Sequence, residues 1–455
     1  MTQLLDYRQF YINGEWVNPA KANDLEVIDP STEKAVAVIS IGDKADTDAA
    51  VAAAKAAFPA WAATAPAERL AYVEKILDIY KRRAKDMARA ISLEMGAPQD
   101  MSLDDQVDCG VYHIDNFIAA FKDFKFVRPL SADTPDTMIA WEPVGVVASI
   151  TPWNWPMNQV TLKVIPAILA GDTVILKPSE IAPLSSIVWT EIVDEAGLPA
   201  GVYNMVNGDG MGVGTQLSTH PDVDMVSFTG STRAGVAITK AAADTVKKVV
   251  LELGGKGANL VFADADENAV ARGVQHCFYN SGQSCNAPTR MLVERSFYDK
   301  AVEIAKKVAD ETAVDIAHKE GAHIGPVISK LQFDKIQGLI QDGINEGARL
   351  VSGGTGLPEH LSEGYFVRPT VFADVNNEMG IAKNEIFGPV LTIIPFDTEE
   401  EAVAIANDTI YGLTNYVQTT DLERRRRLSR QLQAGMVEMN GKSRARGAAF
   451  GGVKA

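Results

Sequence analysis

Two short apolar runs determine the fold of this chain: Gly-Val-Val-Ala-Ser-Ile-Thr at residues 145–151 and Thr-Val-Ile-Leu-Lys-Pro at residues 173–178. Continuous apolar runs of this length are typical of strands that are buried on both faces of a sheet. Similar runs follow at 202–207, 225–229 and 248–253, with amphipathic stretches between them. Strands that alternate with helices in this way predict an α/β fold with a parallel, doubly wound sheet.

The region before these strands has a helical pattern. Residues 46–95 are rich in Ala, Glu, Lys and Arg, with apolar residues at helical spacing, and they predict several antiparallel helices. Pro59 and Pro66 are expected to interrupt the helices. The stretch 127–136 contains two prolines, and we expect an irregular linker or excursion there.

A second alternating region begins after Gly254 and extends to the end of the chain. It predicts a second α/β domain. Its strand candidates lie at 258–262, 290–293, 366–372 and 390–395.

Composition excludes some classes of partner. The chain has 455 residues, of which 46% are hydrophobic, enough for at least two packed domains. Its net charge of -16 disfavours nucleic acid and anionic membranes as partners, because such a surface repels phosphate. The basic run Arg424–Arg427 follows acidic residues, so we interpret it as a solvated helix face with ion pairs. The first residues do not have the pattern of a signal peptide, and no stretch approaches the roughly twenty apolar residues of a membrane span.

The three cysteines, Cys109, Cys277 and Cys285, have neither an even number nor the spacing of a metal site. A disulfide framework is therefore not expected, and the chain is predicted to be cytoplasmic, in a reducing compartment. The six histidines are scattered, so no bound metal is predicted.

Cys285 and Glu252 are candidate catalytic residues. Cys285 lies among small residues in Asn280-Ser-Gly-Gln-Ser-Cys, and a thiolate is a strong nucleophile toward carbonyl carbon. Glu252 ends the fifth strand, where a carboxylate can activate water. The alternatives are an inert buried thiol and a simple helix cap. Cys277 and Cys109 lie in helix-like apolar contexts, and we interpret both as structural.

Asn154 lies in the rigid segment Thr151-Pro-Trp-Asn-Trp-Pro, directly after the first strand. Its side-chain amide can donate two hydrogen bonds without carrying charge, as the stabilisation of an oxyanion requires. It can equally cap the helix that begins near Met157. Composition alone leaves both interpretations open.

Two other strand ends have the character of nucleotide sites. Lys177-Pro-Ser-Glu offers a basic and an acidic group for a ribose, although a solvated loop has the same composition. Phe228-Thr-Gly-Ser-Thr-Arg-Ala-Gly forms a turn that opens a helix, where backbone amides favour a phosphate. Neither this run nor the glycine-rich 208–214 matches the Gly-x-Gly-x-x-Gly fingerprint.

Six motifs, in this order and spacing, resemble the NAD(P)-dependent aldehyde dehydrogenase superfamily. They are Thr151-Pro-Trp-Asn-Trp-Pro, Leu176-Lys-Pro-Ser-Glu, Phe228-Thr-Gly-Ser-Thr, Leu251-Glu-Leu-Gly-Gly-Lys, Gly282-Gln-Ser-Cys and Glu385-Ile-Phe-Gly-Pro. The resemblance extends over nearly the whole chain. It implies a Rossmann-type nucleotide domain, an α/β catalytic domain and a small oligomerisation segment.

The resemblance implies a role for each catalytic residue. Cys285 would attack the aldehyde to give a thiohemiacetal, and Asn154 with the Cys285 backbone amide would form the oxyanion hole. After oxidation, water activated by Glu252 would hydrolyse the thioester to the carboxylic acid. Lys163 matches a family lysine associated with proton relay.

The resemblance also implies NAD as the cofactor, with NADP as an alternative. Glu180 favours NAD because a carboxylate near the ribose hydroxyls repels the additional phosphate of NADP. The positions expected at the cofactor are Ile150, Trp153, Lys177, Ser179, Glu180, Gly210, Gly214, Phe228, Gly230, Ser231, Glu385 and Phe387.

Other activities remain as alternatives. A CoA-acylating semialdehyde dehydrogenase would transfer the acyl group to CoA and would not need Glu252 as a base. A catalytically silent scaffold and a cysteine hydrolase without a redox cofactor are further alternatives, which the intact set of motifs disfavours.

The domains implied by the resemblance are a NAD-binding domain at 1–124 and 144–254, an oligomerisation segment at 125–143 and a catalytic domain at 255–455. A homodimer or homotetramer is expected. The family usually continues beyond the motif Phe450-Gly-Gly, and the tail is expected to be absent here.

The substrate funnel is expected to include Trp155, Arg444 and Phe450. The loop 441–449 lacks the aromatic residue that many relatives place before Phe450. Arg444 and Arg446 are candidates to bind an anionic aldehyde such as a semialdehyde, with solvent exposure as the alternative. The identity of the aldehyde does not follow from the sequence.

Overall fold

The computed structural model describes residues 4–442, 445 and 447–455, and the chain divides into two compact units. The first contains Met1–Asp29, Lys34–Glu94 and Gln99–Leu251. The second contains Pro30–Glu33, Met95–Pro98 and Glu252–Ala455. The division thus falls between Leu251 and Glu252, and two short N-terminal segments that the sequence did not single out belong to the second unit.

The first unit is built on a seven-stranded sheet with the order β12-β11-β8-β9-β10-β2-β3. The four strands β11, β8, β9 and β10 are parallel, and β2 and β3 add an antiparallel edge. Each of β8, β9 and β10 is buried at every residue, as the continuous apolar runs predicted. The strands are β2 (Phe10–Ile12), β3 (Glu15–Val17), β8 (Val146–Ile150), β9 (Thr173–Lys177), β10 (Tyr203–Met205), β11 (Met225–Thr229) and β12 (Lys248–Glu252).

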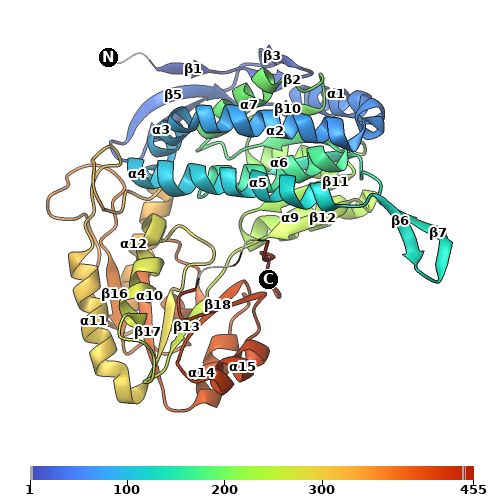
Figure 1. Cartoon of the computed structure of the whole chain (residues 1–455). Helices are drawn as coiled ribbons and strands as arrows, with labels where there is room; N and C mark the ends of the chain where they lie inside the picture. The colour runs from blue at the N-terminus through green and yellow to red at the C-terminus, as the bar shows by residue number, and fades with distance from the viewer. Residues whose placement is uncertain (1–3, 443–444, 446) are drawn as a thin grey trace. The chain divides into compact units, whose positions relative to one another are not determined.

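Helices cover this sheet. α1 packs on β8, β9 and β10, whereas α2, α5, α6 and α7 form a contiguous group (Figure 1). The helices are α1 (Lys44–Ala63), α2 (Pro66–Arg82), α3 (Ala84–Met95), α4 (Gln99–Met101), α5 (Asp108–Asp123), α6 (Pro156–Ala170), α7 (Leu184–Ala196), α8 (Thr215–Thr219), α9 (Thr232–Ala242), the π-helical turns η1 (Ser102–Val107) and η2 (Gly210–Gly214), and the 3₁₀ turn η3 (Ala243–Thr245).

Two smaller sheets complete the first unit, and one corrects the sequence analysis. The first has the order β1-β5-β4, with β1 (Leu5–Tyr7), β4 (Asp24–Asp29) and β5 (Lys34–Ser40). The second is an antiparallel hairpin of β6 (Val127–Ser131) and β7 (Thr134–Ala140), where we expected an irregular linker. Prolines are tolerated in it because both strands are edges.

Pro59 also differs from expectation, because it lies inside α1 and does not end it. Pro66 does mark a boundary: it occupies the first turn of α2, where its missing N–H costs no helical hydrogen bond. We expected both prolines to interrupt helices, but only Pro66 lies at a helix boundary.

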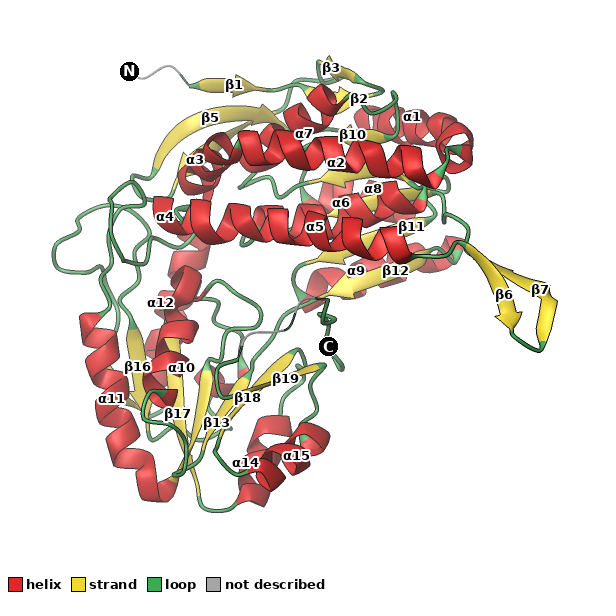
Figure 2. Ribbon diagram, viewed as in Figure 1, coloured by secondary structure: helices red, strands yellow, loops and turns green. Residues whose placement is uncertain are grey.

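The second unit contains another seven-stranded sheet, with the order β15-β16-β17-β14-β13-β18-β19. Its strands β16, β17, β13, β18 and β19 are labelled in Figure 2. All strand pairings in this sheet are parallel except that of β15 with β16. The expected strand at 366–372 begins only at Thr370, and β15, β18 and β19 were not predicted. The strands are β13 (Ala258–Val261), β14 (Arg290–Glu294), β15 (Arg349–Ser352), β16 (Thr370–Ala373), β17 (Val390–Phe396), β18 (Thr414–Gln418) and β19 (Met436–Met439).

Both faces of this sheet are buried. Alternate residues of β17 belong to different cores: Val390 and Ile394 pack with α12 and α14, whereas Leu391 and Ile393 pack with α10 and α11. The prediction of a second α/β domain is thereby confirmed in its fold class. The helices are α10 (Ala269–Phe278), α11 (Tyr298–Glu311), α12 (Lys330–Asn345), α13 (Gly380–Lys383), α14 (Glu399–Asn407), α15 (Leu422–Gln431) and the 3₁₀ turns η4 (Tyr279–Gly282) and η5 (Arg295–Phe297).

The basic run lies on α15, and its interpretation as an ion-paired helix face is confirmed. Arg424 lies over the ring of Phe262 at 4.2 Å and pairs with Asp264 at 2.9 Å. Arg427 pairs with Glu399 at 2.9 Å. These arginines stabilise the second unit internally.

Within the part of the chain that the structure describes, no helix combines the length and apolar character that crossing a membrane requires. Among the same residues, His, Cys, Asp and Glu side chains form no group of three or more that could hold a metal ion.

Candidate functional site

Cys285 follows a tight turn in the second unit. Asn280, Ser281 and Gly282 have consecutive positive φ angles of 52°, 55° and 72°. A Cβ on Gly282 would lie 2.0 Å from the carbonyl oxygen of Gly388, so only glycine allows the two segments to approach this closely. The backbone before the cysteine is therefore strained and fixed, as often found at functional sites.

Side-chain hydrogen bonds hold this turn in place. The Ser281 hydroxyl donates to the carbonyl of Gly325 at 2.7 Å, and the Gln283 side chain accepts from the amide of Ile328 at 2.9 Å. Gln283 also donates to the carbonyl of Asn280 at 3.2 Å. Cys285 is thus presented by a turn that the side chains of Ser281 and Gln283 anchor.

Cys285 as a whole residue is partly exposed to solvent. Burial by the surrounding protein raises its pKa to about 12, with further increases from the charges of Glu385 and Glu252. The backbone amides of Cys285 and Asn286 act in the opposite direction and lower this pKa. Amides that stabilise a negative sulfur are also placed to stabilise an oxyanion attached to it.

Two glycines bring Glu385 close to Cys285. The Glu385 carboxylate accepts a hydrogen bond from the amide of Gly255 at 2.8 Å, and a Cβ on Gly254 would lie 2.7 Å from the same carboxylate. Burial raises the pKa of Glu385, whereas the Gly255 amide and the ammonium groups of Lys335 and Lys256 lower it.

Glu252 lies at the end of β12 and is partly exposed. A Cβ on Gly451 would lie 3.4 Å from its carboxylate oxygen, so the segment that follows Phe450 runs beside Glu252. The second unit therefore brings together three of the predicted residues: Cys285, Glu252 and Glu385.

Phe387 has a positive φ of 61°, which is unusual for a bulky residue. The Gln332 side chain donates to the carbonyls of Ile386 and Phe387 at 3.1 and 2.9 Å and holds this strained peptide. Strain at a predicted cofactor position is consistent with a binding role.

The other two cysteines do not have this setting. Cys277 is fully buried in an apolar core, and Cys109 donates from its thiol to the carbonyl of Gln106 at 3.0 Å. Burial raises the pKa of each to about 12, as it does for Cys285. The backbone around Cys285, and not its acidity, distinguishes the nucleophile candidate.

In the first unit, Asn154 is buried between the end of β8 and the start of α6. The N-cap of α6 is Trp155, so Asn154 lies one residue before the cap position. The Asn154 carbonyl accepts a hydrogen bond from the buried side chain of Gln106 at 3.1 Å. Gln106 lies in the π-helical turn η1, a type of distortion that is frequent at functional sites.

Lys163 is buried on α6, and its ammonium group donates to the hydroxyl of Thr229 at 2.7 Å. Thr229 ends β11. The contact thus places Lys163 at the carboxyl ends of the strands, beside the turn that follows β11.

Lys177 ends β9 and is buried. Its ammonium group donates to the carbonyls of Pro178 and Gly208, the first at 2.7 Å, and lies 3.4 Å from the carboxylate of Glu180. Burial lowers the pKa of Lys177, and Glu180 opposes this effect. Glu180 remains about one-third exposed and can accept hydrogen bonds from a ligand.

The helix α9 begins next to this group at the carboxyl edge of the sheet. Ser231 is its N-cap and accepts from the amide of Ala234 at 3.3 Å. Gly230 is required by packing, since a Cβ there would lie 2.5 Å from the ring of Phe228. The amides of the first turn can bind phosphate.

These strand ends fit a dinucleotide. The carboxyl edge of one parallel sheet carries Glu180, which can accept hydrogen bonds from ribose hydroxyls, the buried ammonium group of Lys177, and the N-terminus of α9. Folds of this kind bind nucleotides at that edge. The other expected positions have different structural support. Ile150 and Ser179 are buried, and Trp153 is partly buried. Gly214 has close neighbours, whereas a Cβ on Gly210 would meet no atom within 4 Å.

The residues expected in the substrate funnel are only partly described. Trp155 and Phe450 are partly buried. Arg444 and Arg446 lie outside the described residues. The interpretation of these arginines as an anion site therefore stays a prediction.

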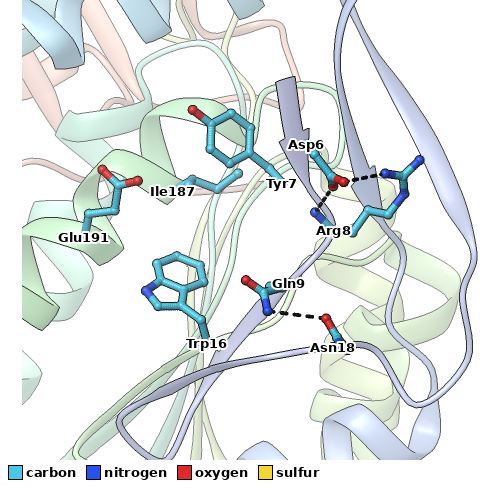
Figure 3. A pocket seen from close by; sticks show the side chains of 8 residues that line it. All are labelled: Asp6, Tyr7, Arg8, Gln9, Trp16, Asn18, Ile187 and Glu191. Atoms are coloured by element: carbon cyan, nitrogen blue, oxygen red, sulfur yellow. Dashed lines mark hydrogen bonds and ion pairs between the residues drawn. The ribbon is translucent and has the colours of Figure 1, made fainter. Parts of the chain in front are cut away.

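A separate pocket of about 560 Å³ lies in the first unit, between the N-terminal strands and α7 (Figure 3). Its charged groups are already paired: Asp6 with Arg8 at 2.8 Å and Glu191 with Arg83 at 2.7 Å. It contains none of the predicted site residues. Its lining residues are Asp6, Tyr7, Arg8, Gln9, Trp16, Asn18, Ile187 and Glu191.

The sequence analysis missed three residues that contact the candidate site residues or their neighbours in the chain. Gln106 binds the carbonyl of Asn154, Tyr416 binds the carbonyl of Asn286, and Lys256 lies buried beside Glu385. Only Lys256 had a local signal, because it belongs to the motif that contains Glu252. The other two reach the site from distant elements.

Comparisons with known proteins agree on one family. The aldehyde dehydrogenase family matches residues 16–455. A 3-succinoylsemialdehyde-pyridine dehydrogenase of a Pseudomonas species is 48% identical over 99% of this chain and 94% of its own length.

Solved structures give the same result. An aldehyde dehydrogenase from Bartonella henselae is 60% identical with a TM-score of 0.99, over 99% of this chain and 95% of that one. A mutant of aldehyde dehydrogenase C from Pseudomonas syringae, complexed with NAD+ and octanal, is 45% identical with a TM-score of 0.96, over 98% of this chain and 92% of that one.

Proposed function

The chain belongs to the aldehyde dehydrogenase family, and from this premise we propose that Cys285 is the nucleophile, Asn154 the oxyanion donor and Glu252 the general base. The protein oxidises an aldehyde to a carboxylic acid and uses NAD. The observation that carries the assignment is the anchored turn that presents Cys285 together with Glu252 and Glu385.

The first step is attack of the Cys285 sulfur on the carbonyl carbon of the aldehyde. With a pKa of about 12 the thiol is protonated at neutral pH, so a base must take its proton during the attack. Glu385, whose charge has the larger effect of the two nearby carboxylates on this pKa, is the acceptor, which leaves Glu252 for the hydrolysis step. The oxyanion of the resulting thiohemiacetal is stabilised by the Cys285 amide and by the side-chain amide of Asn154.

Residues of both sequence regions would hold the cofactor. Lys177 and Glu180 would bind the adenosine ribose, the first turn of α9 would bind phosphate, and Glu385 with Phe387 would bind the nicotinamide side. When bound, NAD supplies the acceptor for the hydride that leaves the thiohemiacetal carbon.

Release of the product needs water. Glu252 takes a proton from a water molecule, which attacks the thioester on Cys285 and yields the carboxylic acid and the free thiol. Lys163, held by Thr229, serves in the proton relay. A CoA-acylating enzyme would not need this base, and formation of NADH without added CoA distinguishes the two reactions.

The test is the variant Cys285→Ala. We expect loss of NADH formation from NAD and an aldehyde, with NAD binding retained in a tryptophan-fluorescence titration. Cys277→Ala is the matched control, because this buried cysteine packs in an apolar core and should leave turnover nearly unchanged. Dehydrogenase activity in Cys285→Ala would overturn the assignment.

The relatives suggest two substrate classes, a semialdehyde that carries a pyridine ring and a long aliphatic aldehyde. Trp155 and Phe450 provide partly buried aromatic surface suited to apolar aldehydes. Ranking octanal, an aromatic aldehyde and a carboxylated semialdehyde by kcat/KM would assign the class.

We further propose a homodimer or homotetramer. The hairpin of β6 and β7 extends from the first unit and exposes four large apolar side chains, each more than half accessible (Figure 1). A surface of this kind is typical of subunit interfaces. The residues are Val127, Leu130, Met138 and Trp141.

A cytoplasmic location is proposed from the chemistry of Cys285. A nucleophilic thiol has to remain reduced, and the cytoplasm keeps thiols in that state. All three cysteines are free thiols.

A further inference from the structure

Tyr416 makes a hydrogen bond that the proposed mechanism does not use. It lies on β18 with 3% of its surface exposed, and its hydroxyl donates to the carbonyl of Asn286 at 2.5 Å. Asn286 is the residue directly after Cys285. A central strand thus contacts the segment that carries the nucleophile.

The position of the Tyr416 hydroxyl is fixed by its surroundings. Its backbone pairs with Asn259 of β13 on one side and with Glu438 of β19 on the other. Its ring contacts that of His276 edge to face, with centroids 5.2 Å apart and an interplanar angle of 81°. A side chain held in this way is a rigid anchor.

Backbone contacts also hold the segment after the cysteine. The amide of Ala287 donates to the carbonyl of Ser284 at 3.0 Å, which closes a turn around Cys285. Gly255 packs against the Cys285 carbonyl. Tyr416 therefore supplies a side-chain anchor on the C-terminal side of Cys285, whereas Ser281 and Gln283 anchor the N-terminal side.

The orientation of this segment determines where two amides point. The backbone amides of Cys285 and Asn286 lower the pKa of the Cys285 thiol against the effect of burial, so they lie within reach of the sulfur. Rotation of the Asn286 residue would move its amide away. Loss of the carbonyl anchor is therefore expected to weaken stabilisation of the thiolate and of the oxyanion on its adduct.

We propose that Tyr416 is a positioning residue of the reaction, whose hydroxyl holds the Asn286 carbonyl and thereby keeps the Cys285 and Asn286 amides directed at the reacting group. This inference rests on the proposed role of Cys285 as nucleophile. Tyr416 touches neither substrate nor cofactor and acts through the backbone.

The test is Tyr416→Phe, which removes the hydroxyl and keeps the ring contact with His276. We expect kcat to fall roughly 10-fold with little change in the KM for the aldehyde, a smaller loss than the ~100-fold cost of removing an oxyanion donor. Alkylation of Cys285 by iodoacetamide, followed by mass spectrometry across pH, should slow at neutral pH, with its profile displaced to higher pH.

Tyr298→Phe is the matched control. The Tyr298 hydroxyl donates to the carboxylate of Asp374 at 3.0 Å, away from Cys285 and within the same unit. Its loss should lower the thermal midpoint without displacing the alkylation profile. If Tyr416→Phe gives the same kcat and the same alkylation profile as the unaltered protein, the inference is wrong.

A second variant tests the inference if Tyr416→Phe does not fold. His276→Leu removes the ring that orients Tyr416 but keeps the hydroxyl, and it should displace both readouts in the same direction by a smaller factor. An unchanged kcat and profile in this variant would count against the inference if Tyr416→Phe is not obtained as folded protein. Cys285→Ala in the same assays separates the two hypotheses. Activity in Cys285→Ala would refute the role of Cys285 as nucleophile. An inactive Cys285→Ala together with normal kcat in Tyr416→Phe would refute only the positioning role of Tyr416.

Discussion

Gly255 lies against the carbonyl oxygen of Cys285, so closely that a Cβ on residue 255 would lie 2.0 Å from that oxygen. Real Cβ atoms do not approach oxygen to this distance, so a side chain would force the two backbones apart. The amide of the same glycine donates to Glu385 at 2.8 Å. Gly255 thus sets the positions of the nucleophile and of a cofactor-side carboxylate together.

Gly255→Ala should therefore lower kcat/KM by about 100-fold, because small displacements of reacting groups have effects of this size. Steady-state assays together with the alkylation rate of Cys285 would measure the change. Gly338→Ala is the control: this exposed position in α12 has no atom within 4 Å of a new Cβ, and alanine there should stabilise the helix by about 1 kcal/mol. Equal activity of the two variants would refute the steric argument.

Glu252→Gln should separate oxidation from hydrolysis. Without its base the thioester persists, so we expect a burst of about one NADH per active site followed by turnover slowed roughly 100-fold. Stopped-flow absorbance of NADH would measure both phases. A steady-state rate near that of the unaltered protein, or a slow phase without any burst, would contradict the role of Glu252 in deacylation.

The sequence predicted the parallel strands of both units because their residues are apolar on both faces. It missed β18, since Thr414, Asn415 and Gln418 are polar yet buried. The hydrogen bonds that permit this burial become visible only in the fold: the Asn415 side chain, for example, accepts from the amide of Ala258 at 2.9 Å. Tertiary contacts override the polarity pattern here.

Site residues could be predicted where the signal is local in the sequence, and were missed where it depends on tertiary contacts. Cys285 and Glu252 stand in local motifs, and glycines next to them indicate close backbone approach. Tyr416 has no such signal, because its contact with Asn286 joins residues 130 positions apart. The hairpin at 127–140 was missed because its strands are exposed and contain prolines, which is the pattern of a loop.

Met138→Asp should weaken the proposed oligomer. Met138 is 51% exposed on β7, and a carboxylate in an apolar interface is costly to bury. Light scattering coupled to size exclusion should show a smaller particle than for the unaltered protein. Leu331→Asp, at an 82% exposed apolar position of α12, is the control and should keep the mass. A monomeric unaltered protein, or an unchanged mass for Met138→Asp, would refute the interface.

Lys256 should destabilise the fold at neutral pH. Its side chain is 2% exposed, its ammonium group has no hydrogen-bond partner, and burial together with Arg290 lowers its pKa from 10.5 to about 7. Below pH 7 the folded and unfolded states are both protonated, and the folded state bears the full cost of the buried charge. Between pH 7 and 10.5 the unfolded state binds more protons, so the stability rises with pH as this cost is relieved.

Lys256→Met removes the charge and keeps a flexible, unbranched side chain of similar length. We expect a gain of about 4 kcal/mol at pH 7 that shrinks to about 1 kcal/mol by pH 9.5, in line with the cost per shifted pKa unit. Thermal midpoints at the two pH values would measure it, with Lys85→Met, at an exposed position of α3, as the control that should show no such pH dependence. A gain that is equal at both pH values, or a loss at pH 7, would show that the Lys256 amine is not a buried charge without a partner.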